Sequence, residues 1–128
     1  MVLEWLDPPF DAGHWVPDVV AAAGGRELLG RPGRPSRTIS WASVVRAAPT
    51  VVLVTPCGFV LERSVAEARR LQVARRVPGA RVVCLDGNAL LSRPGPRLVD
   101  AAELIGHLLH PDVVPAPPTE AGLHVEWG

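Results

Sequence analysis

Three apolar runs in this chain lead directly into loops rich in Trp, Phe, Pro, Gly and Asp. The runs with their loops occupy residues 2–10, 51–59 and 82–88, and a helical pattern follows each of them. The run 51–54 is continuously apolar and β-branched, which is typical of a strand buried on both faces. If the three runs are parallel strands, their loops all emerge at one edge of the sheet, where open α/β sheets bind ligands.

Helical periodicity and stop signals place helices between and after these runs. Ser40 is a good N-cap, Gly24-Gly25 and Pro78-Gly79 are stop signals, and Pro96 suits a first helical turn. The expected helices span residues 14–23, 41–48, 61–77 and 96–109.

The resulting order, β-α-α-β-α-β-α, predicts an α/β fold: a Rossmann-like lobe with a short parallel sheet flanked by helices on both faces. The lobe should cover residues 1–111, and a Pro-rich extended tail should follow at 112–128. A sheet of three strands is thin, which suggests a partner lobe or a second copy.

Composition narrows the class of protein. The chain has 128 residues, 48% hydrophobic and 20% charged, which suffices for one modest core. A net charge of zero argues against nucleic acid or an anionic membrane as the main partner. No apolar run approaches the ~18 residues of a membrane helix and no signal peptide is visible, so the chain as it stands is expected in the cytoplasm.

The loop after the first run carries the strongest binding signal. It places Trp5, Phe10 and Trp15 next to rigid prolines, which present aromatic faces without an ordering cost on binding. For each aromatic taken alone, packing against the sheet is the favoured interpretation. Together with Phe59 in the second loop, they favour a binding face for a large, partly apolar ligand.

Cys57 lies at a strand-to-helix turn, where a helix N-terminus can activate a thiol. The sequence places no His–acid pair beside it, and His14, Asp7 and Cys57 match no metal-ligand spacing. We therefore expect neither enzymatic activity nor a metal site. Cys57 and Cys84 are expected to be reduced thiols rather than a disulfide.

The segment before the last helix is a candidate polar anchor. Arg93 or Arg97, with backbone N–H groups at the helix start, suits a carboxylate, phosphate or amide group of a ligand. The alternative is an ordinary ion pair between one of these arginines and Asp100.

Three segments of the chain together resemble the C-terminal lobe of cobalamin-binding-type ABC-transporter solute receptors. They are WLDPPFDAGHWVPDVV, TPCGFVLERS and DGNALLSRPGPRLVDAAELI. In these receptors one long rigid helix joins two lobes. The resemblance covers residues 2–111. It implies a periplasmic-binding-protein-like lobe that closes on a bulky ligand, such as a corrinoid, haem or iron–siderophore, and delivers it to a membrane permease.

The resemblance also implies roles for individual residues. Asp18, at the start of the first helix, matches the position where related receptors dock on permease arginines, although a plain helix-dipole role fits it equally. Leu90 and Leu91 replace the usual aromatic pair, so stacking there would be weaker. The ligand-facing positions would be Trp5, Asp7, Pro8, Phe10, Trp15, Phe59, Leu90, Ser92 and Arg93.

The N-terminal lobe and connecting helix of such receptors would precede Met1. The expectation is therefore either a fragment of an extracytoplasmic receptor or a half-receptor that pairs with another copy as a homodimer. The predicted function is a non-enzymatic solute-binding lobe of an ABC import system for cobalamin or a similar ligand. The alternative is a dimerising interaction module whose ligand face is vestigial and which has no role in transport.

Overall fold

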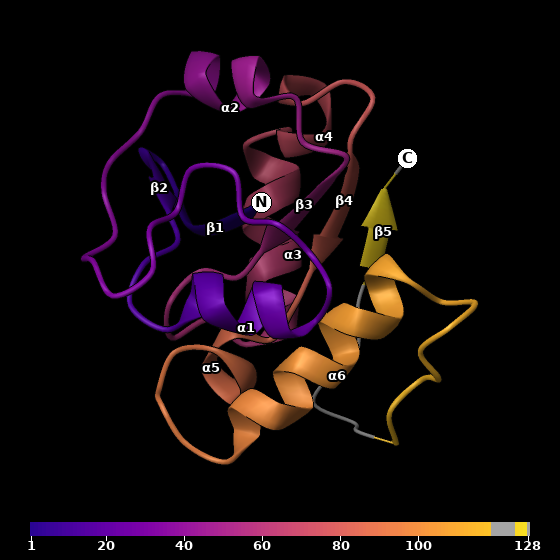
Figure 1. Cartoon of the computed structure of the whole chain (residues 1–128). Helices are drawn as coiled ribbons and strands as arrows, with labels where there is room; N and C mark the ends of the chain where they lie inside the picture. Colours follow the sequence, from indigo (N-terminus) through magenta and orange to yellow (C-terminus); the bar gives the residue numbers. More distant parts are fainter. Residues whose placement is uncertain (119–124, 128) are drawn as a thin grey trace.

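One mixed sheet forms the centre of an α/β fold in this computed structural model, which describes residues 1–118 and 125–127 (Figure 1). The strands are β1 (Val2–Leu6), β2 (Pro9–Asp11), β3 (Val51–Val54), β4 (Arg81–Cys84) and β5 (Val125–Trp127). They lie in the order β2-β1-β3-β4-β5. β1, β3 and β4 are parallel to one another, and the outer strands β2 and β5 are antiparallel to their neighbours.

Helices cover both faces of the sheet (Figure 1). They are α1 (Val16–Ala22), α2 (Trp41–Ala47), α3 (Leu61–Arg70), α4 (Val73–Arg76), α5 (Gly87–Leu90) and α6 (Arg97–Leu109). One hydrophobic cluster joins alternate strand residues such as Val2, Leu53 and Val83 to α1, α5 and α6, and another joins Leu3 and Val52 to α2, α3 and α4. The predicted burial of β3 on both faces is confirmed. None of the helices described in residues 1–118 has the length and apolarity to cross a bilayer.

The sequence predicts β3 to the residue, and it predicts α2 with its Ser40 cap to within one residue. Two helix boundaries were wrong. α1 begins at Val16 because His14 has a left-handed backbone (φ 54°) that precedes the helix. The helix expected over 61–77 is interrupted at Gln72 (φ 53°), which separates α3 from α4.

Three short elements were not predicted from the sequence. β2 turns back beside β1, and α5 forms in the expected loop after β4 because the Asp86 carboxylate accepts a hydrogen bond from the Ala89 N–H at 2.8 Å. β5 lies within the predicted extended tail and pairs with β4. The rest of that tail at 119–124 and 128 lies outside the described residues.

A segment between α1 and α2, residues 24–40, runs across the hairpin end of the sheet, and we call it the strap. Asp11 in β2 holds it most directly. The Asp11 carboxylate, 1% exposed, accepts hydrogen bonds from the Arg37 backbone N–H at 2.7 Å and from the Arg37 guanidinium at 2.9 Å. The Ile39 N–H adds a backbone hydrogen bond to the Pro9 carbonyl at 2.8 Å.

Two further carboxylates fix the strap at either end. Glu27, within the strap, accepts hydrogen bonds from the Val2 N–H at 2.8 Å and from the Leu28 N–H at 3.0 Å. Glu4 of β1 accepts a hydrogen bond from the Ser36 hydroxyl. Because buried acceptors without donors are costly, these contacts fix where the strap crosses the sheet.

We expect Asp11→Ala to lower the free energy of unfolding by about 1–2 kcal/mol, because it leaves the Arg37 backbone N–H without its acceptor, while the half-exposed Arg37 guanidinium can turn to water. Urea denaturation measures the loss. Asp18→Ala is the matched control, since Asp18 is exposed in the first turn of α1 and its removal should cost less than about 0.5 kcal/mol. Equal losses for the two variants would contradict this account of the strap.

Candidate functional site

The chain that follows the carboxyl ends of β1, β3 and β4 forms one edge of the molecule, and we call residues 5–8, 55–60 and 85–97 the carboxyl rim. Hydrogen bonds join its loops to one another. The Asn88 N–H donates to the Phe59 carbonyl at 3.2 Å, and the Gly58 N–H donates to the Ser92 hydroxyl at 3.2 Å. The parallel arrangement therefore brings loops from distant parts of the sequence together, as predicted.

Trp5 and Phe59 are in edge-to-face contact on this rim, with ring centroids 5.2 Å apart and an interplanar angle of 72°. The Arg63 guanidinium lies over the Phe59 ring, 3.8 Å from its centroid. Phe59 is thus covered from two directions and only 7% exposed, whereas Trp5 is 37% exposed. A ligand on the rim would meet Trp5 and Arg63 before Phe59.

Sequence analysis did not identify Arg63 as a site residue. A signal was present, because Arg63 follows Phe59 by four residues, the spacing at which side chains meet on a helix. The contact is a cation–π interaction with Phe59, the same ring that Trp5 contacts edge-to-face.

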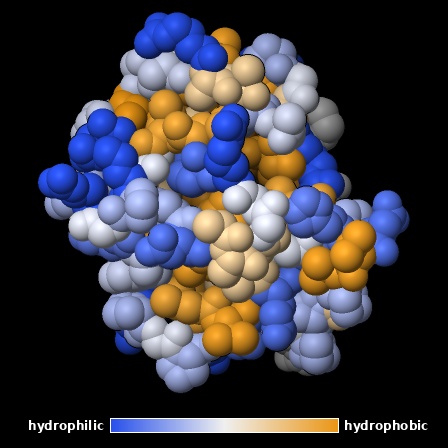
Figure 2. Space-filling model, viewed as in Figure 1, coloured by the Kyte–Doolittle hydropathy of each residue, from blue (hydrophilic) through white to orange (hydrophobic). Residues whose placement is uncertain are grey.

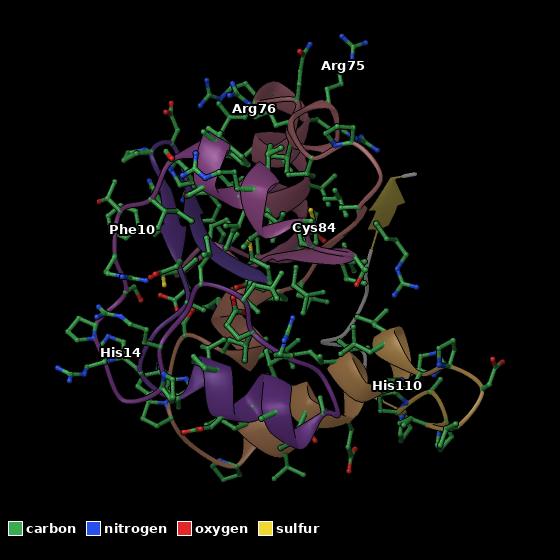
Figure 3. The ribbon with its side chains drawn as sticks, turned by 45° about the horizontal axis from the view of Figure 1, so that its top comes forward. Phe10, His14, Arg75, Arg76, Cys84 and His110 are labelled. Atoms are coloured by element: carbon green, nitrogen blue, oxygen red, sulfur yellow. The ribbon has the colours of Figure 1, made fainter. Side chains whose placement is uncertain are left out.

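Three of the predicted ligand-facing side chains are engaged elsewhere. The Trp15 indole N–H donates to the Leu91 carbonyl at 2.9 Å, and its ring packs against the core beneath α1 and α6. Leu90 is 1% exposed within that core. Phe10 is half-buried in β2, paired with Trp5 in the sheet and bridged to Thr38 of the strap, on the outer flank of the molecule (Figure 3).

The remaining predicted residues are polar or exposed. Asp7 and Pro8 lie at the exposed tip of the β1–β2 hairpin, where the Asp7 carboxylate is 4.0 Å from the Arg70 guanidinium. The Ser92 hydroxyl donates to the Gly87 carbonyl at 2.7 Å, so it ties the rim loops together. Arg93 is exposed.

A hollow of about 360 Å³ opens beside Arg93, between α5 and the start of α6. Arg93 and Arg97 both contribute to its lining, together with Asn88 and the Pro94–Pro96 turn. The two guanidinium groups make the hollow suitable for an anionic or strongly polar group. Its volume suits one substituent of a bulky ligand and not a whole corrinoid.

Gly87 permits the close approach of two rim loops. A Cβ atom built on Gly87 would lie 2.9 Å from the Pro56 carbonyl oxygen and 3.0 Å from the Thr55 carbonyl oxygen. These contacts are with backbone atoms, which have little room to move aside. The loops after β3 and β4 therefore meet only because this residue has no side chain.

We expect Gly87→Ala to lower the free energy of unfolding by about 1–3 kcal/mol, because the added methyl group pushes the two loops apart. Gly106→Ala in α6 is the matched control: its Cβ would have ordinary contacts, the nearest at 3.5 Å, and helix propensity favours Ala. Thermal denaturation of both variants measures the difference. A tolerated Gly87→Ala would show that the rim is loosely packed.

Cys57 on the rim and Cys84 at the end of β4 are both free thiols. Burial and the nearby Glu4 carboxylate raise the pKa of the exposed Cys57 thiol, and burial raises the pKa of Cys84 to about 12. Cys84 lies in the interior (Figure 3). Both shifts favour the unreactive thiol over the nucleophilic thiolate.

We expect iodoacetamide to alkylate Cys57 more slowly at pH 7.5 than it alkylates a small-molecule thiol, with a rate that rises steeply as the pH approaches the raised pKa. In a Cys57→Ser variant, Cys84 should react only after unfolding in urea. Mass spectrometry of the alkylated protein follows both reactions. Rapid alkylation of Cys57 at neutral pH would instead support a nucleophilic role.

No group of three or more His, Cys, Asp and Glu side chains among the described residues is arranged to hold a metal ion. His14 is exposed on the flank of the hairpin, with its ring 5.6 Å from that of Trp15 (Figure 3). Asp18 is exposed in the first turn of α1, as the predicted docking role requires.

Comparison of the chain with protein-family models, with curated proteins and with solved structures finds no match.

Proposed function

We propose that this chain is a non-enzymatic solute-binding lobe of an ABC import system, which holds cobalamin or a similar bulky ligand on its carboxyl rim. One observation supports the proposal: Trp5 from β1 and Arg63 from α3 both pack on Phe59 at this rim and are themselves exposed. Trp5 offers a flat apolar contact and Arg63 a cationic one. Asn88, whose N–H donates to the Phe59 carbonyl, also lines the hollow of Arg93. The flat macrocycle of a corrinoid suits Trp5 and Arg63, and its polar side arms suit the hollow of Arg93.

The proposed binding mode requires a second wall. Trp5 and the hollow cover only one side of a large ligand, so a second lobe or another copy of the chain would be needed to enclose it. Asp18 is exposed on α1, on the opposite face of the sheet from Arg63 and on the same face as α5 and α6, where its carboxylate would be available to permease arginines.

We expect cyanocobalamin to quench Trp fluorescence and shift the ligand's absorbance, with a dissociation constant in the high micromolar range for the isolated chain. Trp5→Ala should weaken binding about tenfold or more, since exposed aromatic anchors dominate such contacts. The control is Trp41→Phe, because Trp41 packs against Arg76 on the α2–α4 face, 5.1 Å from the ring centroid to the guanidinium carbon.

Sedimentation in the presence and absence of ligand distinguishes the alternative. A tight dimer that is indifferent to cobalamin would support the interaction module instead. Absence of any spectral change at millimolar cobalamin, in monomer or dimer, would count decisively against the solute-binding proposal. An equal loss of affinity in Trp5→Ala and Trp41→Phe would indicate that cobalamin does not bind at the carboxyl rim.

A further inference from the structure

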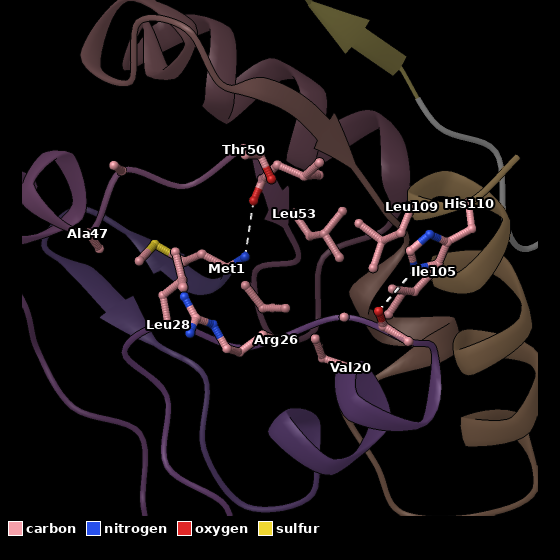
Figure 4. A pocket seen from close by; sticks show the side chains of 15 residues that line it. Met1, Val20, Arg26, Leu28, Ala47, Thr50, Leu53, Ile105, Leu109 and His110 are labelled. Carbon is pink, nitrogen blue, oxygen red and sulfur yellow. Dashed lines mark hydrogen bonds between the residues drawn. The ribbon is translucent and has the colours of Figure 1, made fainter.

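The opposite edge of the sheet contains a separate cavity of about 370 Å³ (Figure 4). It lies at the amino ends of β1 and β3, where the carboxyl ends of α1, α2 and α6 converge. We call it the amino cavity. Its lining residues are Met1, Val2, Val20, Gly24, Gly25, Arg26, Leu28, Ala47, Ala48, Thr50, Val51, Leu53, Ile105, Leu109 and His110.

The walls of the amino cavity are mainly aliphatic. Leu28 and Met1 form one side, Ile105 and Leu109 the other, and Leu53 lies between them (Figure 4). Apolar surface is also visible between α2 and α1 in the space-filling view of this side (Figure 2). A concave aliphatic surface of this size is within the range of pockets that hold small molecules.

Arg26 supplies a cationic side chain in the lining, and the Met1 ammonium group beside it already donates a hydrogen bond to the Val51 carbonyl at 3.0 Å. The Arg26 side chain (Figure 4) makes no hydrogen bond or ion pair with any residue that the structure describes. His110 differs, because its Nε2 is already engaged with the Gly24 carbonyl at 2.9 Å. An unpaired guanidinium at an apolar hollow is matched by a ligand with an anionic head and an apolar body.

We propose that the amino cavity binds a medium-chain aliphatic carboxylate, with its carboxylate on Arg26 and its chain against the half-buried side chains of Leu28, Val51 and Leu109. The position of the head group follows from electrostatics. The converging helix ends present carbonyl oxygens, which repel an anion, so the carboxylate belongs at the Arg26 side and the uncharged chain belongs at the α6 side.

This site is independent of the proposed solute-binding function. The carboxyl rim and the amino cavity lie at opposite ends of the parallel strands and share no lining residue. A carboxylate bound at the amino cavity would contact the ends of α1, α2 and α6 together, so it would stabilise the packing of these helices on the sheet.

Titration of the ¹⁵N-labelled protein with hexanoate, octanoate and octan-1-ol tests the proposal. Octanoate should cause saturable shifts of the Gly24, Gly25 and Leu28 amide signals. Affinity should rise about fourfold for each methylene added between hexanoate and octanoate, the increment expected for burial of a CH₂ group. Arg26→Gln should weaken octanoate binding about tenfold and leave octan-1-ol binding unchanged.

Arg31→Gln is the matched control, because Arg31 is exposed on the same strap but does not line the cavity. It should leave all three affinities unchanged. Octan-1-ol binding to Arg26→Gln verifies that the cavity persists in the variant. The proposal is overturned if octanoate causes no saturable shift at these amides, if octan-1-ol binds as tightly as octanoate, or if the two arginine variants behave alike.

Discussion

The burial of carboxylates beneath the strap is the constraint on which the rest of the architecture depends. Asp11 is almost fully inaccessible, and its hydrogen bonds to the backbone and guanidinium of Arg37 offset the cost of burying its charge. Two further carboxylates also fix the strap: Glu27 accepts a hydrogen bond from the Val2 N–H at the start of β1, and Glu4 accepts one from the Ser36 hydroxyl. Because the strap is fixed, α2 packs on the same face of the sheet as α3 and α4, while α1 packs on the opposite face.

The parallel strands then give the two edges of the sheet different chemistry. At the carboxyl rim, loops are hydrogen-bonded to one another, and Trp5 and Arg63 pack on Phe59. At the amino edge, helix ends converge around aliphatic side chains and Arg26. The two proposed sites therefore differ in chemistry and would not compete for the same ligand.

How far the sequence predicts this structure depends on how local the determining interaction is. β3 follows from its β-branched run and α2 from its Ser40 cap, because both signals lie within a few residues. The break at Gln72 has no local Gly or Pro to mark it. The meeting of the rim loops was predictable from parallel topology. The burial of Leu90 beneath α1 and α6 and the hydrogen bond from Trp15 to the Leu91 carbonyl, 76 residues away, were not, because they are tertiary contacts with no local signal.

β2 also determines how the molecule meets its neighbours. The Asp11 N–H donates to the Arg37 carbonyl and the Pro9 carbonyl accepts from the Ile39 N–H, so the strap occupies hydrogen-bonding groups that an edge strand would otherwise expose. Exposed edge strands are templates for cross-β aggregation and for sheet continuation between subunits. The strap already pairs with the outer edge of β2. Any homodimer formed on the hairpin side must therefore associate through side chains and not by main-chain extension of the sheet.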